Sequence, residues 1–242
     1  MVGGEAAADA IATARRLDRL RVGLHMVLVD GKPVLAPERL PDLVDASGRL
    51  RTDLPRLGLE ICARPAVRAQ VRAEIEAQFR GYLATGLPLD HVNAHKHFHL
   101  HPVVGSEIIA IGRRYGMRGL RVPCEPAAVL ARLEPGAAPA PAYVSPWIRL
   151  LRRRVRRHGL RATDQVFGLA WSGALSAARL AGLLRQLPTG TTEIYLHPGT
   201  RDGFPGSAPG YRYGDELAAL TDPDVVALTR RTDLTLGGYA DF

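Results

Sequence analysis

The chain has 242 residues, of which 46% are hydrophobic, so its length and composition suit one large domain with a substantial core. Its two cysteines are far apart, which excludes a disulfide framework and a thiolate zinc site. The sequence has no apolar run of about 18 residues and no signal-peptide pattern at its start, so we expect a cytoplasmic protein without a membrane-spanning helix. The net charge of +8 permits anionic partners without identifying one.

Helical patterns alternate along the chain with short apolar or β-branched runs, as is typical of parallel α/β folds. The periodicity predicts helices over residues 5–17, 64–85, 103–115 and 172–187. It predicts strands over residues 20–28, before His95, and over 120–122, 165–169, 192–196 and 234–236. We therefore predict one α/β domain spanning residues 1–242. The chain opens on a helix, whereas a parallel fold usually starts its first crossover from a strand, so we expect a missing first strand.

Five of the eight histidines lie within eleven residues of sequence, at odd-numbered positions from His91 to His101. In an extended chain all five would lie on one face. Neutral imidazole is the commonest metal ligand, so this density predicts a metal site. A catalytic metal usually keeps about three protein ligands and an open position, so not all five histidines can be ligands. We expect others, among them His97, His99 and His101, to face the substrate or to support the ligands.

Two further histidines end short predicted strands. His25 closes the run LRVGLH and His197 closes TTEIYLH. In parallel α/β folds, ligands and catalytic groups gather at the carboxyl ends of strands, so we expect these imidazoles near the cluster. A buried structural histidine is the alternative for His25, because a neutral ring can both donate and accept a hydrogen bond.

The segments VGLHMVL, LDHVNAHKHFHLHP, RGLRVPCEP, TEIYLHPG and LGGYADF resemble the YdjC-like (ChbG/HpnK) carbohydrate deacetylases, most closely the hopanoid-biosynthesis branch HpnK. The resemblance implies an irregular (β/α) barrel that removes N-acetyl groups from amino sugars. It implies a divalent metal, Mg or Zn, held by one aspartate and two histidines, which match His25 and His95 here. His197 matches a family histidine at the mouth of the site, and this match implies that His197 donates a proton to the departing amine.

Two other residues are candidates for the chemistry of amide hydrolysis. Arg121, at a predicted strand end, would stabilise the oxyanion or orient a carboxylate. Asp164, which opens the next strand, would orient an imidazole. For both residues an ordinary structural ion pair is an equal alternative.

The family pattern begins with a strand that leads into an Asp-Asp pair, which supplies the third ligand and the base, and this sequence does not contain it. We therefore expect Met1 to be an internal methionine of a longer gene product, and the form that begins there to bind metal weakly. Asp9 and Asp30 are the carboxylates available nearby. The alternative function is a catalytically impaired remnant that binds metal or sugar.

An arginine-rich helix is predicted around residues 145–160, from Arg149 to Arg157, with Trp147, Leu151 and Val155 on one stripe. Such a helix would contact an anionic membrane surface that presents a hopanoid glycolipid substrate, which would place the protein at the inner membrane face. An outer helix whose apolar stripe packs inward is the alternative, and a lipid-surface scaffold is a third class of function. Nucleic acid is not expected as a partner, because aromatic residues do not alternate with the arginines. A homodimer is expected as the commonest assembly of such domains.

Overall fold

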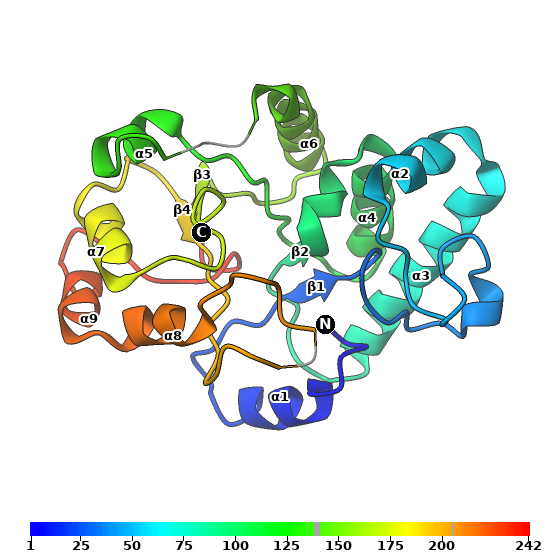
Figure 1. Ribbon diagram of the computed structural model, residues 1–242, viewed down its shortest axis with the longest axis horizontal. Helices are drawn as coiled ribbons and strands as arrows, with labels where there is room; N and C mark the ends of the chain where they lie inside the picture. The colour runs from blue at the N-terminus through cyan, green and yellow to red at the C-terminus, as the bar shows by residue number, and fades with distance from the viewer. Residues whose placement is uncertain (138–140, 205) are drawn as a thin grey trace. The chain divides into compact units, whose positions relative to one another are not determined.

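The structure is a computed structural model that describes residues 1–137, 141–204 and 206–242. Its chain divides into two compact units (Figure 1). Unit 1 comprises Met1–Arg121, Pro146–Ala162 and Gly237–Phe242, and unit 2 comprises Val122–Ser145 and Thr163–Leu236.

Unit 1 is built mainly from helices around one pair of parallel strands. Its helices are α1 (Ala7–Ala14), η1 (Pro37–Arg39), α2 (Leu54–Ala63), α3 (Pro65–Leu83), η2 (His95–Leu100), α4 (Pro102–Arg114) and α6 (Ser145–Arg157). Strands β1 (Leu24–Met26) and β2 (Val92–Ala94) pair in parallel, with His25 opposite Asn93. Single bridges continue the pairing from Val92 to Leu120 and from Gly119 to Arg161.

Helix α3 forms because its apolar residues recur every three or four positions and so cover one face. Val67, Val71, Ile75 and Phe79 are fully or almost fully buried on that face. Burying each such side chain stabilises the fold by about 1.5–3 kcal/mol relative to leaving it exposed. The predicted helix over residues 64–85 is therefore confirmed.

A buried glutamine of α3 limits the length of β1. The side chain of Gln78 accepts a hydrogen bond from Val27 N at 2.9 Å, and donates one to Val27 O at 2.6 Å. The amide thus satisfies both backbone groups that a neighbouring strand would otherwise pair with. Next to it, the buried carboxylate of Glu74 accepts hydrogen bonds from Val34 N and Leu35 N. These contacts fix the loop that follows β1.

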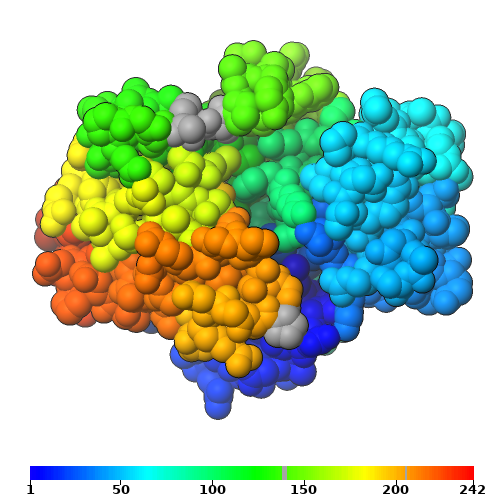
Figure 2. Space-filling model, viewed as in Figure 1, coloured from blue at the N-terminus to red at the C-terminus, as the bar shows by residue number. Residues whose placement is uncertain are grey.

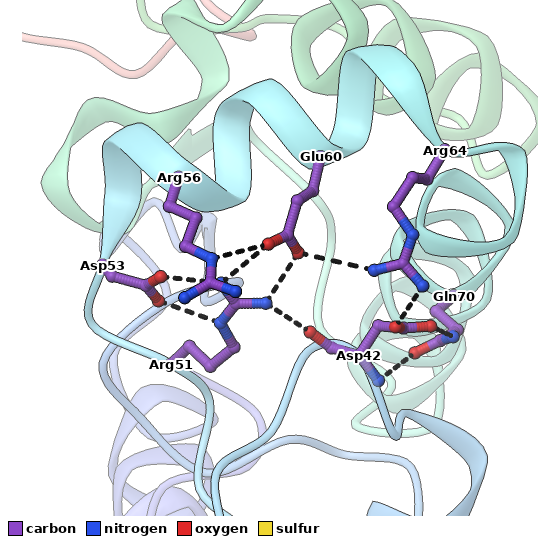
Figure 3. Close-up of polar contacts among 7 residues, drawn as sticks. All are labelled: Asp42, Arg51, Asp53, Arg56, Glu60, Arg64 and Gln70. Carbon is purple, nitrogen blue, oxygen red and sulfur yellow. Dashed lines mark hydrogen bonds and ion pairs between the residues drawn. The ribbon is translucent and has the colours of Figure 1, made fainter.

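A polar network joins that loop to α2 and α3 (Figure 3). The guanidinium of Arg51 contacts Asp53 at 2.6 Å and Glu60 at 2.8 Å, and donates to Asp42 O. Asp42 also pairs with Arg64 at 2.7 Å. In the space-filling view the medium-blue loop lies directly against the cyan helices (Figure 2). The periodicity predicted no helix between residues 28 and 64, so α2 was missed.

Helix α6 packs its apolar stripe inward. Leu151 and Val155 are buried, whereas Trp147 is 44% exposed. A side chain at Gly105 of α4 would come within 3.2 Å of Leu151, so the two helices approach closely there. Arg154 donates to Pro102 O. This is the arrangement expected of an outer helix with solvated arginines.

Unit 2 contains a second pair of parallel strands, β3 (Gln165–Phe167) and β4 (Thr192–Ile194). Its helices are α5 (Ala127–Leu133), η3 (Ala142–Val144), α7 (Ala177–Arg185), α8 (Tyr213–Thr221) and α9 (Pro223–Thr229). A core that includes Phe167, Trp171 and Leu183 lies between them. The strand predicted over residues 234–236 is wrong, because that segment has no strand pairing and Leu236 is 71% exposed.

The predicted α/β class is confirmed by these two parallel pairs. In the described part of the chain the strands form two separate two-stranded sheets, so the irregular (β/α) barrel with a missing first strand stays a prediction. No described helix is both long and apolar enough to cross a membrane.

Candidate functional site

The carboxyl ends of β1 and β2 bring two predicted metal ligands together in unit 1. His25 lies on β1, and His95 directly follows β2. Their ring centroids are 5.7 Å apart, with the ring planes at 74°. Parallel pairing causes this proximity, because it sets His25 beside Asn93, two residues before His95.

His25 is held by its strand partner and is largely buried. Its Nδ1 lies 2.5 Å from Asn93 Oδ1, an oxygen that can only accept, so Nδ1 carries the hydrogen. Burial lowers the pKa of His25 to about 3, and the nearby His95 and Arg121 add to the effect. The ring is therefore neutral at physiological pH, and its Nε2 keeps a lone pair. A metal ligand requires that state.

The chain does not continue as a strand after His95. Lys96 and His97 have φ of 50° and 51°, in the left-handed region that side chains rarely adopt. An ion pair of 2.5 Å between Lys96 Nζ and Asp30 Oδ2 spans this turn, and Asp30 itself has φ of 50°. The hydrogen bond from Lys96 holds the pKa of Asp30 below its usual value, with a smaller contribution from His95. Asp30 is thus an ionised carboxylate close to His95.

Because of this turn, the histidines after His95 do not share one face of an extended segment. His99 is fully buried, and its Nε2 lies 2.9 Å from Arg121 O. His101 precedes α4, where its Nδ1 accepts from Val104 N and its Nε2 lies 3.1 Å from Gly58 O. The ring of His97 lies 5.9 Å from that of His99. His99 and His101 therefore have structural contacts, and a role in supporting the ligands stays a prediction.

Arg121 belongs to the same neighbourhood. Its backbone N donates to Val92 O, which ties residue 121 to β2. The residue is 9% exposed, and its charge helps to lower the pKa of both His25 and His99. Arg121 is thus a buried cation near His25, and its oxyanion role stays a prediction.

Asp164 and His197 lie in unit 2. Asp164 accepts hydrogen bonds from Thr191 N at 2.9 Å and Thr191 Oγ1 at 3.0 Å, and so holds the turn that leads into β4. A side chain at Gly190 would come within 2.6 Å of this carboxylate. These hydrogen bonds give Asp164 a local structural contact. Both the ion-pair alternative and its role in orienting an imidazole stay predictions.

The ring of His197 lies among tyrosines. Its centroid is 5.5 Å from Tyr195 and 5.0 Å from Tyr211, both in edge-on geometry. Its backbone N donates to the buried carboxylate of Glu216, which also accepts from Leu175 N. The side chain is 38% exposed, so solvent reaches it, and its role as a proton donor stays a prediction.

We tested the implied metal against the residues present. His25 and His95 supply two nitrogen donors, whereas a catalytic metal usually has about three protein ligands. Within the described ranges, no group of three or more His, Cys, Asp or Glu is arranged to hold a metal ion. The pair therefore fits part of a metal site.

Comparison with known proteins finds carbohydrate deacetylases that match the whole chain. A carbohydrate deacetylase of Geobacillus stearothermophilus is 28% identical over 245 residues, which cover 100% of this chain and 84% of that protein. A carbohydrate deacetylase of Mus musculus is 35% identical over 272 residues, with the same two coverages.

A solved structure supports the fold. A putative cellobiose-phosphate cleavage protein from Enterococcus faecalis matches with a TM-score of 0.73 and 20% identity, over 99% of this chain and 85% of that one. The model of the YdjC-like protein family matches residues 1–231. The chain therefore belongs to the YdjC-like protein family.

Proposed function

We propose that this chain hydrolyses the N-acetyl group of an amino-sugar unit in a metal-dependent reaction. The predicted enzyme class, a carbohydrate deacetylase, is confirmed by the relatives named so. One structural observation supports the metal above all others. A neutral His25, with Nδ1 bonded to Asn93, stands beside His95 at the ends of two paired strands.

The chemistry explains why such a pair is useful. An amide carbonyl is a poor electrophile, and a bound divalent metal would polarise its oxygen and bring a bound water toward a neutral pKa. His25 and His95 would hold that ion, Mg or Zn. Arg121 would stabilise the negative charge that develops on the carbonyl oxygen. On the family resemblance alone, we also propose His197, a residue of unit 2, as the proton donor to the departing amine nitrogen.

The substrate we propose is an N-acetylated sugar carried by a hopanoid lipid, on the resemblance of the histidine-rich motif to that branch of the family. Membrane contact would have to use the exposed arginines of α6 and Trp147, because Leu151 and Val155 are buried. The light-green atoms of α6 form part of the surface in Figure 2. Liposome co-sedimentation with and without anionic lipid tests this contact. The homodimer and the cytoplasmic location stay predictions.

Acetate release tests the proposed function. The protein is incubated with an N-acetylglucosaminyl lipid or a soluble N-acetylglucosamine oligosaccharide, after metal removal and with Zn²⁺ or Mg²⁺ restored. The proposal predicts acetate release that needs the metal and is faster on the lipid. Faster release from the soluble sugar would refute the lipid substrate. Metal binding without acetate release from either compound would favour the catalytically impaired remnant.

A further inference from the structure

A continuous row of hydrogen bonds runs from a buried carboxylate to His25. His91 Nδ1 lies 2.8 Å from Asp90 Oδ2, and His91 Nε2 lies 3.4 Å from Asn93 Nδ2. Asn93 Oδ1 then lies 2.5 Å from His25 Nδ1. Asp90 and Asn93 are buried, and all four residues belong to unit 1. We call this row the Asp90–His25 relay.

The chemistry of Asp90 sets the direction of every bond in the relay. Both oxygens of Asp90 accept backbone N–H groups, so a His91 ring with one hydrogen carries it on Nδ1 and leaves Nε2 as an acceptor. The amide of Asn93 must then turn its NH₂ toward His91 and its oxygen toward His25. That oxygen in turn requires hydrogen on His25 Nδ1. The lone pair of His25 is therefore on Nε2, the nitrogen outside the relay.

The closing segment of the chain, residues 237–242, holds the far end of the relay. Backbone N–H groups of Tyr239 and Ala240 donate to Asp90 at 3.0 and 2.9 Å. The Tyr239 ring stacks on His91, with centroids 4.7 Å apart and planes at 21°. Asp90 thus receives three hydrogen bonds, which fix its carboxylate.

Two glycines make room for these contacts. A side chain at Gly23 would come within 2.7 Å of the His91 ring and of His91 O. A side chain at Gly238 would come within 2.6 Å of Asp90 Oδ1. Both distances are too short for a real carbon atom, so glycine is required at each position. The segments VGLHM and LGGYADF therefore meet at the relay, one at each end.

We propose that the Asp90–His25 relay is a positioning device. It fixes the tautomer and orientation of His25, so that Nε2 is presented as a ligand before any ion binds, and Tyr239 and Ala240 anchor it. The proposal rests on the proposed function in one respect, that His25 binds a metal. Outer partners of this kind typically change metal affinity by roughly 10- to 100-fold when removed.

The primary test is the tautomer of His25, read from long-range ¹H–¹⁵N correlation spectra of the metal-free protein with ¹⁵N-labelled histidine. The pH is held well above the ordinary histidine pKa of about 6.5. The relay predicts hydrogen on Nδ1 of both His25 and His91. Hydrogen on Nε2 of His25 in the unaltered protein would overturn the proposal. Because no metal is present, this readout does not depend on the proposed function.

Variants of the middle residue test causation. Asn93→Leu removes both amide contacts, so we expect His25 to lose its Nδ1–H preference and zinc affinity, measured by calorimetry, to fall roughly 10- to 100-fold. Asn93→Asp keeps an acceptor for His25 Nδ1 and should retain the tautomer. His91→Phe keeps a ring against Tyr239 but separates Asp90 from Asn93, and should give a mixed tautomer. Unchanged tautomer and affinity in Asn93→Leu and His91→Phe would refute the relay.

Tyr82→Phe is the matched control. It removes hydrogen bonds from the hydroxyl to Val22 O and Pro88 O, which lie just before β1 and β2. It should lower the free energy of unfolding without changing the His25 tautomer or zinc affinity. An equal loss of zinc affinity in this control would show that loosened strands, and not the relay, cause the effect. Failure of the unaltered protein to bind zinc, with hydrogen on Nδ1, would refute the metal part of the proposed function and support the relay.

Discussion

Acid should destabilise this protein through His99, and Gln in its place should remove the effect. His99 Nε2 donates to Arg121 O, whereas its buried Nδ1 has no hydrogen-bond partner among the described residues. A second proton would need a buried N–H without an acceptor, so burial lowers the pKa of His99 well below its ordinary value. The unfolded chain titrates near pH 6.5, and therefore binds more protons than the folded chain below that pH.

The sign and size of the effect follow from this difference. The stabilisation from a neutral His99 is complete above pH 6.5 and is lost as the pH falls, at about 1.4 kcal/mol per pH unit. Over two pH units the loss is about 2.7 kcal/mol. In His99→Gln the amide still donates to Arg121 O and does not titrate. Relative to His99→Gln, the unaltered protein should therefore lose about 2.7 kcal/mol of unfolding free energy over the two pH units below pH 6.5.

Urea unfolding, followed by tryptophan fluorescence at a series of pH values with a chelator present, measures this difference. His25 titrates equally in both proteins and cancels in the comparison. Parallel curves of unfolding free energy against pH for His99→Gln and the unaltered protein would refute the reasoning.

Three further substitutions test the packing and the turn. Arg51→Met should lower the free energy of unfolding by about 1 kcal/mol, because it removes the hydrogen bond to Asp42 O and one charged partner of Glu60, which keeps its contact with Arg56. Urea unfolding that shows no such loss would contradict this. Leu151→Ala should lower the free energy of unfolding by about 2–5 kcal/mol, because the side chain is buried, whereas Trp147→Ala should lower it by less than about 1 kcal/mol. A larger loss of thermal stability in Trp147→Ala than in Leu151→Ala would show that the apolar stripe of α6 does not pack inward. Lys96→Met removes the ion pair with Asp30 across the left-handed turn, so the zinc affinity measured by calorimetry should fall by up to about tenfold. A zinc affinity equal to that of the unaltered protein would show that the turn does not help to position the metal ligands.

Periodicity and strand ends were enough to predict the elements that position the site. Strand ends placed His25 near the histidine cluster, and the family resemblance singled out His95 as its partner; the structure brings the two rings together. Helix α3 was equally predictable, because its apolar residues repeat at helical spacing. Helix α2 was missed because proline and charged residues surround it and hide a short apolar stripe.

The features of the site that the sequence did not predict depend on tertiary contacts, which a single sequence does not show. Alternating histidines suggest an extended segment, but left-handed Lys96 and His97 end it, and the ion pair with Asp30 comes from a loop 66 residues earlier. Asn93 and Asp90 were also missed. The motif NAH contains the amide, but only the register of β1 against β2 shows that it faces His25.

Acetate release by His95→Ala tests the central claim most directly. The matched control is His158→Ala, which removes an exposed histidine away from the strand ends. With an N-acetylglucosaminyl substrate and added divalent metal, we expect the control to match the unaltered protein and His95→Ala to lose more than about 100-fold of its rate. Full activity in His95→Ala would contradict the assignment of the site to the ends of β1 and β2.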